Sequence, residues 1–115
     1  MVKVAILVLA DTQSQGDLAR VANALEAVKE FKEAKDDVRL IFDGAGVKWP
    51  VDFSKPDHTL NGLFEAVRDR VTGVCGLCAQ AFGVQERISL CGIPLFDRHL
   101  SLRKFISAGY QVITF

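Results

Sequence analysis

The feature that most constrains the fold is an uninterrupted apolar run, Val4 to Ala10, which Asp11 ends. A run without polar alternation is typical of a strand that is buried on both faces, as strands inside a parallel sheet are. The run is far shorter than the about 20 apolar residues that a membrane-spanning helix needs. The sequence therefore predicts a central strand, and we expect no membrane association.

Helix-type and strand-type patterns alternate along the rest of the chain. Apolar side chains recur every three or four residues from Leu18 to Phe31 and again from Leu60 to Val67, as one face of an amphipathic helix requires. Val38–Phe42 and Val71–Cys75 have the composition of short buried strands. The remaining expected elements are short helices at Cys78–Phe82, Val84–Leu90 and Leu102–Ile106 and strands at Gly92–Leu95 and Tyr110–Phe115.

This alternation predicts an α/β fold, a three-layer α/β/α sandwich with a five-stranded parallel sheet. A chain of 115 residues is long enough for one domain, which we expect to span residues 1–115. Ligand sites in such sheets lie beyond the carboxyl ends of the strands. Three segments meet that condition, namely Asp11–Gly16, the residues from Asp43 onward, and Cys75–Cys78.

The charge balance and the cysteine count exclude several classes of protein. Fourteen Lys and Arg residues balance fourteen Asp and Glu residues, so no excess positive charge is present to bind nucleic acid. Three cysteines form an odd set, with two of them only three positions apart, which argues against a secreted disulfide framework. No small-x-small cleavage site follows the first apolar run, so we expect a cytoplasmic protein with free thiols.

The sharpest chemical signal is Cys75-Gly76-Leu77-Cys78, at the end of a predicted strand and the start of a predicted helix. The free N–H groups and the dipole of a helix start favour the thiolate, which is the nucleophilic form of cysteine. The spacing also permits an intramolecular disulfide. The alternative is that these cysteines are small buried residues, and this is the interpretation that we favour for Cys91.

Other dithiol and cofactor sites fit the sequence less well. A closed zinc site needs four ligands, and Cys75, Cys78, Cys91 and either His58 or His99 would have to supply them without a second CxxC or an HxxxH. We therefore expect no metal, and we expect both histidines at the surface. A thioredoxin-like dithiol follows an early strand rather than a third one. A flavin site lacks a glycine-rich phosphate loop, so we expect no cofactor.

Two loops are expected to shape the entrance to the cysteines. The first carries the polar residues Asp11, Thr12 and Ser14 and ends at Gly16. Either Ser14 or Asp17 is expected to cap the helix that follows. The second loop follows Asp43 and runs from Gly44 to His58. It contains Trp49, for which packing on the core is the simpler expectation.

Taken together, these motifs resemble the DsrE/DsrF-like family, small sulfur-handling proteins that include the TusD and DsrE sulfur-relay subunits and YchN-type proteins. The resemblance covers nearly the whole chain and depends on the order and spacing of four segments. These segments are the start Val4–Val8, the strand end Phe42–Ala45, the CxxC of Cys75–Cys78 followed by Ala79–Val84, and the ending Val112–Phe115.

The resemblance implies a five-stranded parallel sheet and homo- or hetero-oligomers, commonly trimers or hexamers. It also implies that Cys75 accepts sulfane sulfur as a persulfide from a donor protein and passes it to an acceptor protein. Cys78 matches a second cysteine that would assist or resolve this intermediate. The expected activity is that of a sulfurtransferase or persulfide carrier. The alternative is a non-catalytic oligomeric subunit or small-ligand binding module in which the cysteines are structural.

Overall fold

The protein is described here by a computed structural model that covers residues 1–115. Four parallel strands form one sheet in the order β3-β2-β1-β4. The strands are β1 (Lys3–Val8), β2 (Asp37–Phe42), β3 (Val71–Val74) and β4 (Gln111–Thr114). β1 pairs on both sides, with β2 from Lys3↔Asp37 to Val8↔Phe42 and with β4, which confirms the predicted central strand.

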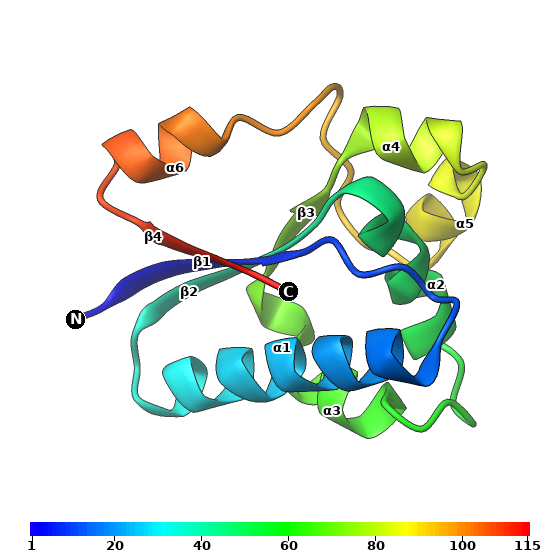
Figure 1. Ribbon diagram of the computed structural model, residues 1–115, viewed down its shortest axis with the longest axis horizontal. Helices are drawn as coiled ribbons and strands as arrows, with labels where there is room; N and C mark the ends of the chain where they lie inside the picture. Colours follow the sequence, from blue (N-terminus) through cyan, green and yellow to red (C-terminus); the bar gives the residue numbers. More distant parts are fainter.

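One face of the sheet carries the main core. α1 (Gln15–Glu33) and α3 (Asn61–Val67) lie side by side below it in Figure 1. Ser14 caps α1 by accepting the Asp17 N–H, and the Asp17 side chain accepts the Ser14 N–H in return. α1 is the longest helix, and neither it nor any other helix is long and apolar enough to cross a membrane. The core on this side joins 22 buried residues.

The opposite face of the sheet is covered more thinly. α6 (Leu102–Ser107) lies above the sheet in Figure 1, joined to the rest by an extended segment. Only four buried residues form the core there, and they are Ala5, Leu7, Ile41 and Leu100. Since buried apolar area supplies most of the stabilisation, this face is the more easily opened one.

Short helices gather at the carboxyl end of the sheet, on the right of Figure 1. Beyond this end lie the 3₁₀ helix η1 (Gly44–Lys48), α2 (Trp49–Phe53), α4 (Gly76–Ala81) and α5 (Gln85–Leu90), while a second 3₁₀ helix, η2 (Arg68–Arg70), leads into β3. The loop expected from Gly44 to His58 is therefore largely helical. Pro50 lies in the first turn of α2. An N–H at this position would have no partner within the helix, so the proline costs no helical hydrogen bond.

Trp49 packs on the core, as the simpler expectation had it. Its side chain is buried and stacks on Phe53, with ring centroids 5.4 Å apart. The indole Nε1–H donates to the Ala10 carbonyl over 2.8 Å. The tryptophan therefore anchors α2 to the residues that follow β1.

The prediction of five strands is wrong, because the segment Gly92–Leu95 does not form a strand of the sheet. A single parallel bridge joins Leu95 to Val74. Val74 N–H donates to the Pro94 carbonyl over 3.0 Å, and Phe96 N–H donates to the Val74 carbonyl over 2.9 Å. Pro94 has no N–H with which to extend the ladder. The α/β class and the parallel sheet are confirmed, with four strands.

The close contact of η1 with β1 makes a prediction about Gly46. A Cβ atom on this buried glycine would lie 2.2 Å from the Val8 carbonyl oxygen. We expect Gly46→Ala to lower the free energy of unfolding by about 1–3 kcal/mol, because backbone must move to admit the methyl group. The urea midpoint of the folded chain measures this loss.

Gly62→Ala is the matched control for this substitution. Gly62 is exposed in α3, and a Cβ there meets nothing within 4 Å. Alanine favours the helix by up to ~1 kcal/mol over glycine, so the midpoint should stay or rise. An unchanged midpoint in Gly46→Ala would contradict the tight packing of η1 on β1.

Candidate functional site

Cys75 occupies the junction between β3 and α4. It is fully buried and caps the start of α4, where its Sγ accepts the Cys78 N–H over 3.4 Å. The strand-to-helix position predicted for the CxxC is therefore correct. The Cys75 sulfur thus lies at the start of α4, where it accepts one of the N–H groups that the helix leaves unpaired.

Gly76 allows a close approach of two segments of the chain. A Cβ atom at this position would lie 1.9 Å from the carbonyl oxygen of Phe96. The glycine therefore lets the segment after Phe96 pass directly over the start of α4. His99 is carried by that segment.

Asp43 supplies a buried carboxylate from the neighbouring strand. It follows β2 and begins η1, where its Oδ1 accepts the Gly44 N–H over 2.8 Å. Gly44 has a φ of +53°, a left-handed conformation that glycine adopts without strain. The same Oδ1 accepts a hydrogen bond from the Cys78 thiol over 3.3 Å.

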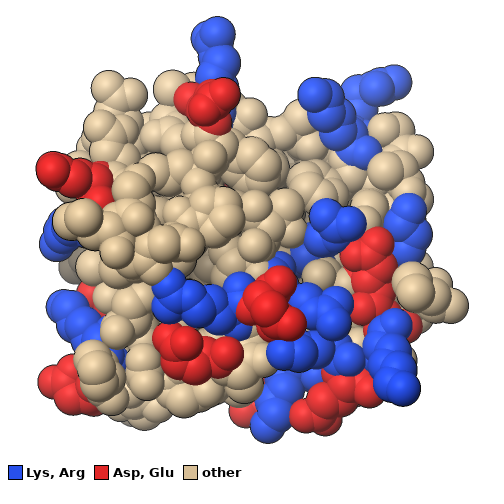
Figure 2. Space-filling view, turned by 180° about the vertical axis from the view of Figure 1, so that it is seen from behind, with Lys and Arg blue, Asp and Glu red and all other residues tan.

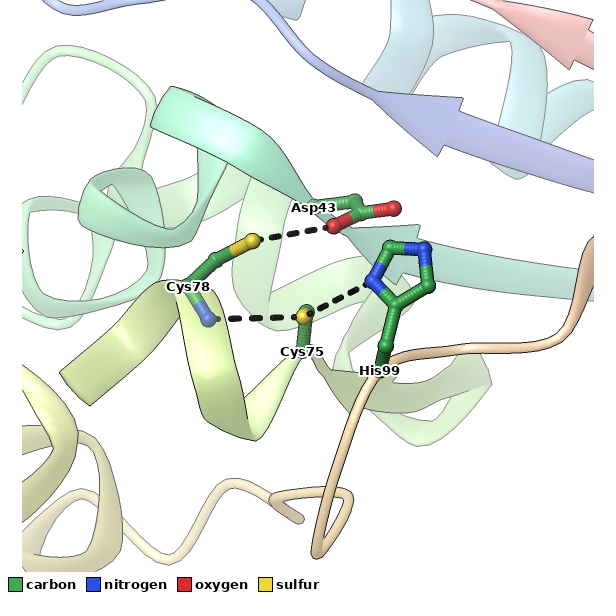
Figure 3. A group of neighbouring side chains, drawn as sticks. All are labelled: Asp43, Cys75, Cys78 and His99. Atoms are coloured by element: carbon green, nitrogen blue, oxygen red, sulfur yellow. Dashed lines mark hydrogen bonds between the residues drawn. The ribbon is translucent and has the colours of Figure 1, made fainter. Parts of the chain in front are cut away.

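His99 completes the group, as Figure 3 shows. Its Nδ1 lies 3.6 Å from Cys75 Sγ, although the residue as a whole is exposed. Residues 97–101 make no backbone–backbone hydrogen bond, and Leu100 anchors them in the thin core. His99 thus lies over Cys75 on a segment that few interactions hold.

The two cysteines have different electrostatic surroundings. Burial raises the pKa of the Cys78 thiol to about 12, and the hydrogen bonds that join it to Cys75 and Asp43 act in the same direction. Cys78 therefore keeps its proton at neutral pH. Cys75 instead accepts the Cys78 N–H and lies beside the imidazole of His99.

The structure also brings together four atoms that bind metals. Four side chains each contribute one possible ligand atom, and these atoms all lie within 4.8 Å of one another. The residues are Asp43, Cys75, Cys78 and His99. Cys91 and His58, which the sequence offered for a zinc site, are not part of this group. His58 Nδ1 instead accepts the Leu60 N–H over 3.0 Å, and its ring lies edge-on to Trp49 and Phe53.

The residues expected at the entrance separate into two places. Asp43 and Gly44 lie at the cysteines. Thr12, Ser14 and Trp49 line a different hollow, which the cysteines do not reach, and Gly16 lies in the first turn of α1. The entrance role of this first loop stays a prediction.

Asp11 has an indirect link to the cysteine helix. Its carboxylate pairs with Lys48 Nζ over 2.5 Å, and this hydrogen bond is the main reason why the pKa of Asp11 is lowered. The same Lys48 ammonium lies 5.1 Å from the ring centroid of Phe82, just after α4. The loop after β1 is thereby joined to the end of the helix that Cys75 caps.

The sequence pattern did not reveal His99 as a site residue. It belongs to no spaced motif and was expected at the surface, where most of the residue does lie. The bridge at Leu95, the missing side chain at Gly76 and the buried side chain of Leu100 hold its segment over Cys75. None of these contacts has a sequence signature.

Comparisons with known proteins cover almost the whole chain. The model of the DsrE/DsrF-like family matches residues 3–115. An uncharacterized protein of Methanocaldococcus jannaschii, MJ0733, is 34% identical over 104 residues, which are 88% of this chain and 84% of that protein.

Two solved structures share the fold. The YchN protein of E. coli superposes with a TM-score of 0.66 at 21% identity, over 100% of both chains. BT1422 of Bacteroides thetaiotaomicron, a conserved protein of unknown function, gives 0.65 at 17% identity over 96% of this chain and 94% of its own.

The surroundings of Cys78 predict its titration. With a pKa of about 12 against an ordinary 9.0, its thiolate fraction at pH 8 is lower by roughly a thousandfold. Its alkylation rate, followed by peptide mapping in the presence of a chelator, should therefore rise steadily to beyond pH 11. Asp43→Asn removes a carboxylate that raises the pKa, so this variant should react faster at pH 8. A plateau below pH 9 in the wild type would contradict the assignment.

Proposed function

The chain belongs to the DsrE/DsrF-like family, and from this premise we propose that it accepts sulfane sulfur on Cys75 and passes it on as a persulfide. Family membership suggests a sulfur-relay role. The observation that carries the finer proposal is the convergence of the Cys78 N–H and His99 Nδ1 on Cys75 Sγ. The two groups support a thiolate from different sides.

Sulfur acceptance is a displacement that needs no external oxidant. The Cys75 thiolate attacks the outer sulfur of a donor persulfide, so that a new S–S bond forms as the donor S–S bond breaks. The donor leaves as a thiolate, and Cys75 carries the transferred sulfur. His99 is positioned to take the Cys75 proton before the attack.

With Cys78 nearby, the Cys75 persulfide can undergo two competing reactions. An acceptor thiolate that attacks the outer sulfur regenerates the Cys75 thiolate and completes the transfer. If Cys78 attacks the inner sulfur instead, hydrosulfide leaves and a Cys75–Cys78 disulfide forms, which a cellular dithiol must then reduce with two electrons. Because the Cys78 thiol is protonated and hydrogen-bonded to Asp43, transfer of the sulfur to an acceptor is favoured over disulfide formation. A reducing cytoplasm suits this chemistry.

A donor reaches Cys75 only when the cover over it opens. The Cys75 side chain has no exposed surface in this conformation. The segment that carries His99 lacks backbone hydrogen bonds from residue 97 to 101, so it belongs to the part of the fold that opens most readily. Movement of His99 exposes the sulfur while α4 keeps its N–H in place.

Association of copies is the second part of the proposal. Large apolar side chains remain exposed on α5 and α6, with Leu90 81% and Ile106 61% accessible. Figure 2 shows most of the charged side chains of that view in its lower half, and a broad uncharged area above them that charged side chains border at the top and upper right. Such a surface supports a homo-oligomer.

Light scattering on the full chain tests the association. We expect the mass of a trimer or hexamer, and we expect Leu90→Glu or Ile106→Glu to shift the population toward smaller species. A monomer at every concentration would contradict the proposed assembly.

Sulfur loading tests the proposed chemistry. The chelated, reduced protein is incubated with glutathione persulfide, and its intact mass is measured before and after reductant. We expect a reductant-sensitive gain of whole sulfur atoms in the wild type and none in Cys75→Ser. Cys78→Ser should load and hold its sulfur longer, because it lacks the resolving thiol.

Cys91→Ser is the control for loss of a thiol outside the site, and it should load like the wild type. Full loading of Cys75→Ser would show that Cys75 is not the acceptor. No loading in any form, with both site thiols inert until the chain unfolds, would favour the alternative of a binding module with structural cysteines.

A further inference from the structure

The four-residue group around Cys75 has the composition of a metal site. Two thiols, one imidazole and one carboxylate are donors that zinc binds in proteins. They come from three separate places in the chain, the ends of β2 and β3 and the segment before α6, and Figure 3 shows them directed toward one another.

The distances agree with tetrahedral coordination. Zinc bonds of about 2.0–2.3 Å imply ligand-to-ligand separations of about 3.6 Å for mixed sulfur and nitrogen or oxygen pairs. Cys75 Sγ lies 3.6 Å from His99 Nδ1, and Cys78 Sγ lies 3.3 Å from Asp43 Oδ1. No pair of the four atoms is more than 4.8 Å apart, so shifts of about 1 Å close the tetrahedron.

Three of the four ligands are held in place by backbone contacts. The Cys75 N–H donates to the Phe42 carbonyl over 3.0 Å, which ties the end of β3 to the end of β2. Asp43 is oriented by the Gly44 N–H, and Cys78 lies in the first turn of α4. His99 is exposed and provides the path by which an ion enters.

We propose that Asp43, Cys75, Cys78 and His99 form a closed, four-coordinate zinc site. Each thiol that binds the ion gives up its proton, so up to two protons are released and no electron is transferred. This proposal differs from the expectation of a chain without a metal. It uses Asp43 in place of Cys91 as the fourth ligand.

Zinc at this site would also switch off sulfur transfer, an extension that rests on the proposed function. The ion occupies the Cys75 lone pair that attacks the donor. It also joins His99 to the cysteines, which holds the covering segment closed. Zinc-bound protein is therefore inert toward persulfide, and removal of the ion restores acceptance.

Metal titration of the reduced full chain tests the site. Cobalt(II) should bind once per chain with sulfur-to-metal charge transfer and the visible bands of tetrahedral cobalt, and zinc should displace it. Zinc affinity, measured against a competing chelator, should fall by at least about a hundredfold in His99→Ala and in Asp43→Asn. His99 lies at the surface, so its substitution leaves the core intact.

Two control variants separate the site from nearby charge and thiol content. Asp97→Asn removes an exposed carboxylate two positions from His99, and Cys91→Ser removes the third thiol. Both should bind zinc like the wild type. Equal affinity in the wild type, His99→Ala and Asp43→Asn would overturn the four-ligand site, as would the absence of the cobalt spectrum.

Loading with glutathione persulfide, with and without one equivalent of zinc, separates the two proposals. Loading that zinc blocks and a chelator restores supports both. Loading in the chelated protein without a cobalt spectrum overturns the zinc site and leaves the relay standing. A cobalt spectrum without loading in the chelated protein overturns the relay and leaves the zinc site standing.

Discussion

The hydrogen bond from the Cys75 N–H to the Phe42 carbonyl fixes where the site forms. It joins the carboxyl ends of β2 and β3, so the next residue after Phe42 and the residue after β3 become neighbours. These residues are Asp43 and Cys75. The helix that Cys75 caps then places Cys78 against the Asp43 carboxylate. One pairing of parallel strands thus brings together a carboxylate, the buried sulfur of Cys75 and the protonated thiol of Cys78.

A second constraint brings His99 to this edge. Leu95 pairs with β3 through one bridge, and Gly76 leaves room for the carbonyl of Phe96. The chain therefore turns over the start of α4, and His99 comes to lie beside Cys75. Because the remaining contacts of this segment are few, the cover over the sulfur is also the least secured part of the site. The residues that cover the Cys75 sulfur are therefore also the residues that must move before a donor can reach it.

Much of this arrangement could be predicted from the sequence, because it follows from local patterns. The apolar run gave the central strand, Ser14 and Asp17 gave the start of α1, and the CxxC was placed correctly between strand and helix. The helices within residues 44–53 were not predicted, because both are only five residues long and Pro50 fits a first helical turn as well as a loop. His99 escaped because its position depends on contacts between distant segments, which leave no periodic trace.

The central claim is that Cys75 is a nucleophile in the folded protein, although its side chain is covered. Site-resolved alkylation at neutral pH, in native chelated protein and in urea, tests this claim most directly. The account predicts that Cys75 reacts in the native state, at a rate set by opening of the segment that carries His99, because this opening exposes a sulfur to which the Cys78 N–H still donates. Reaction of Cys75 only after unfolding would contradict it and make the cysteine part of the core.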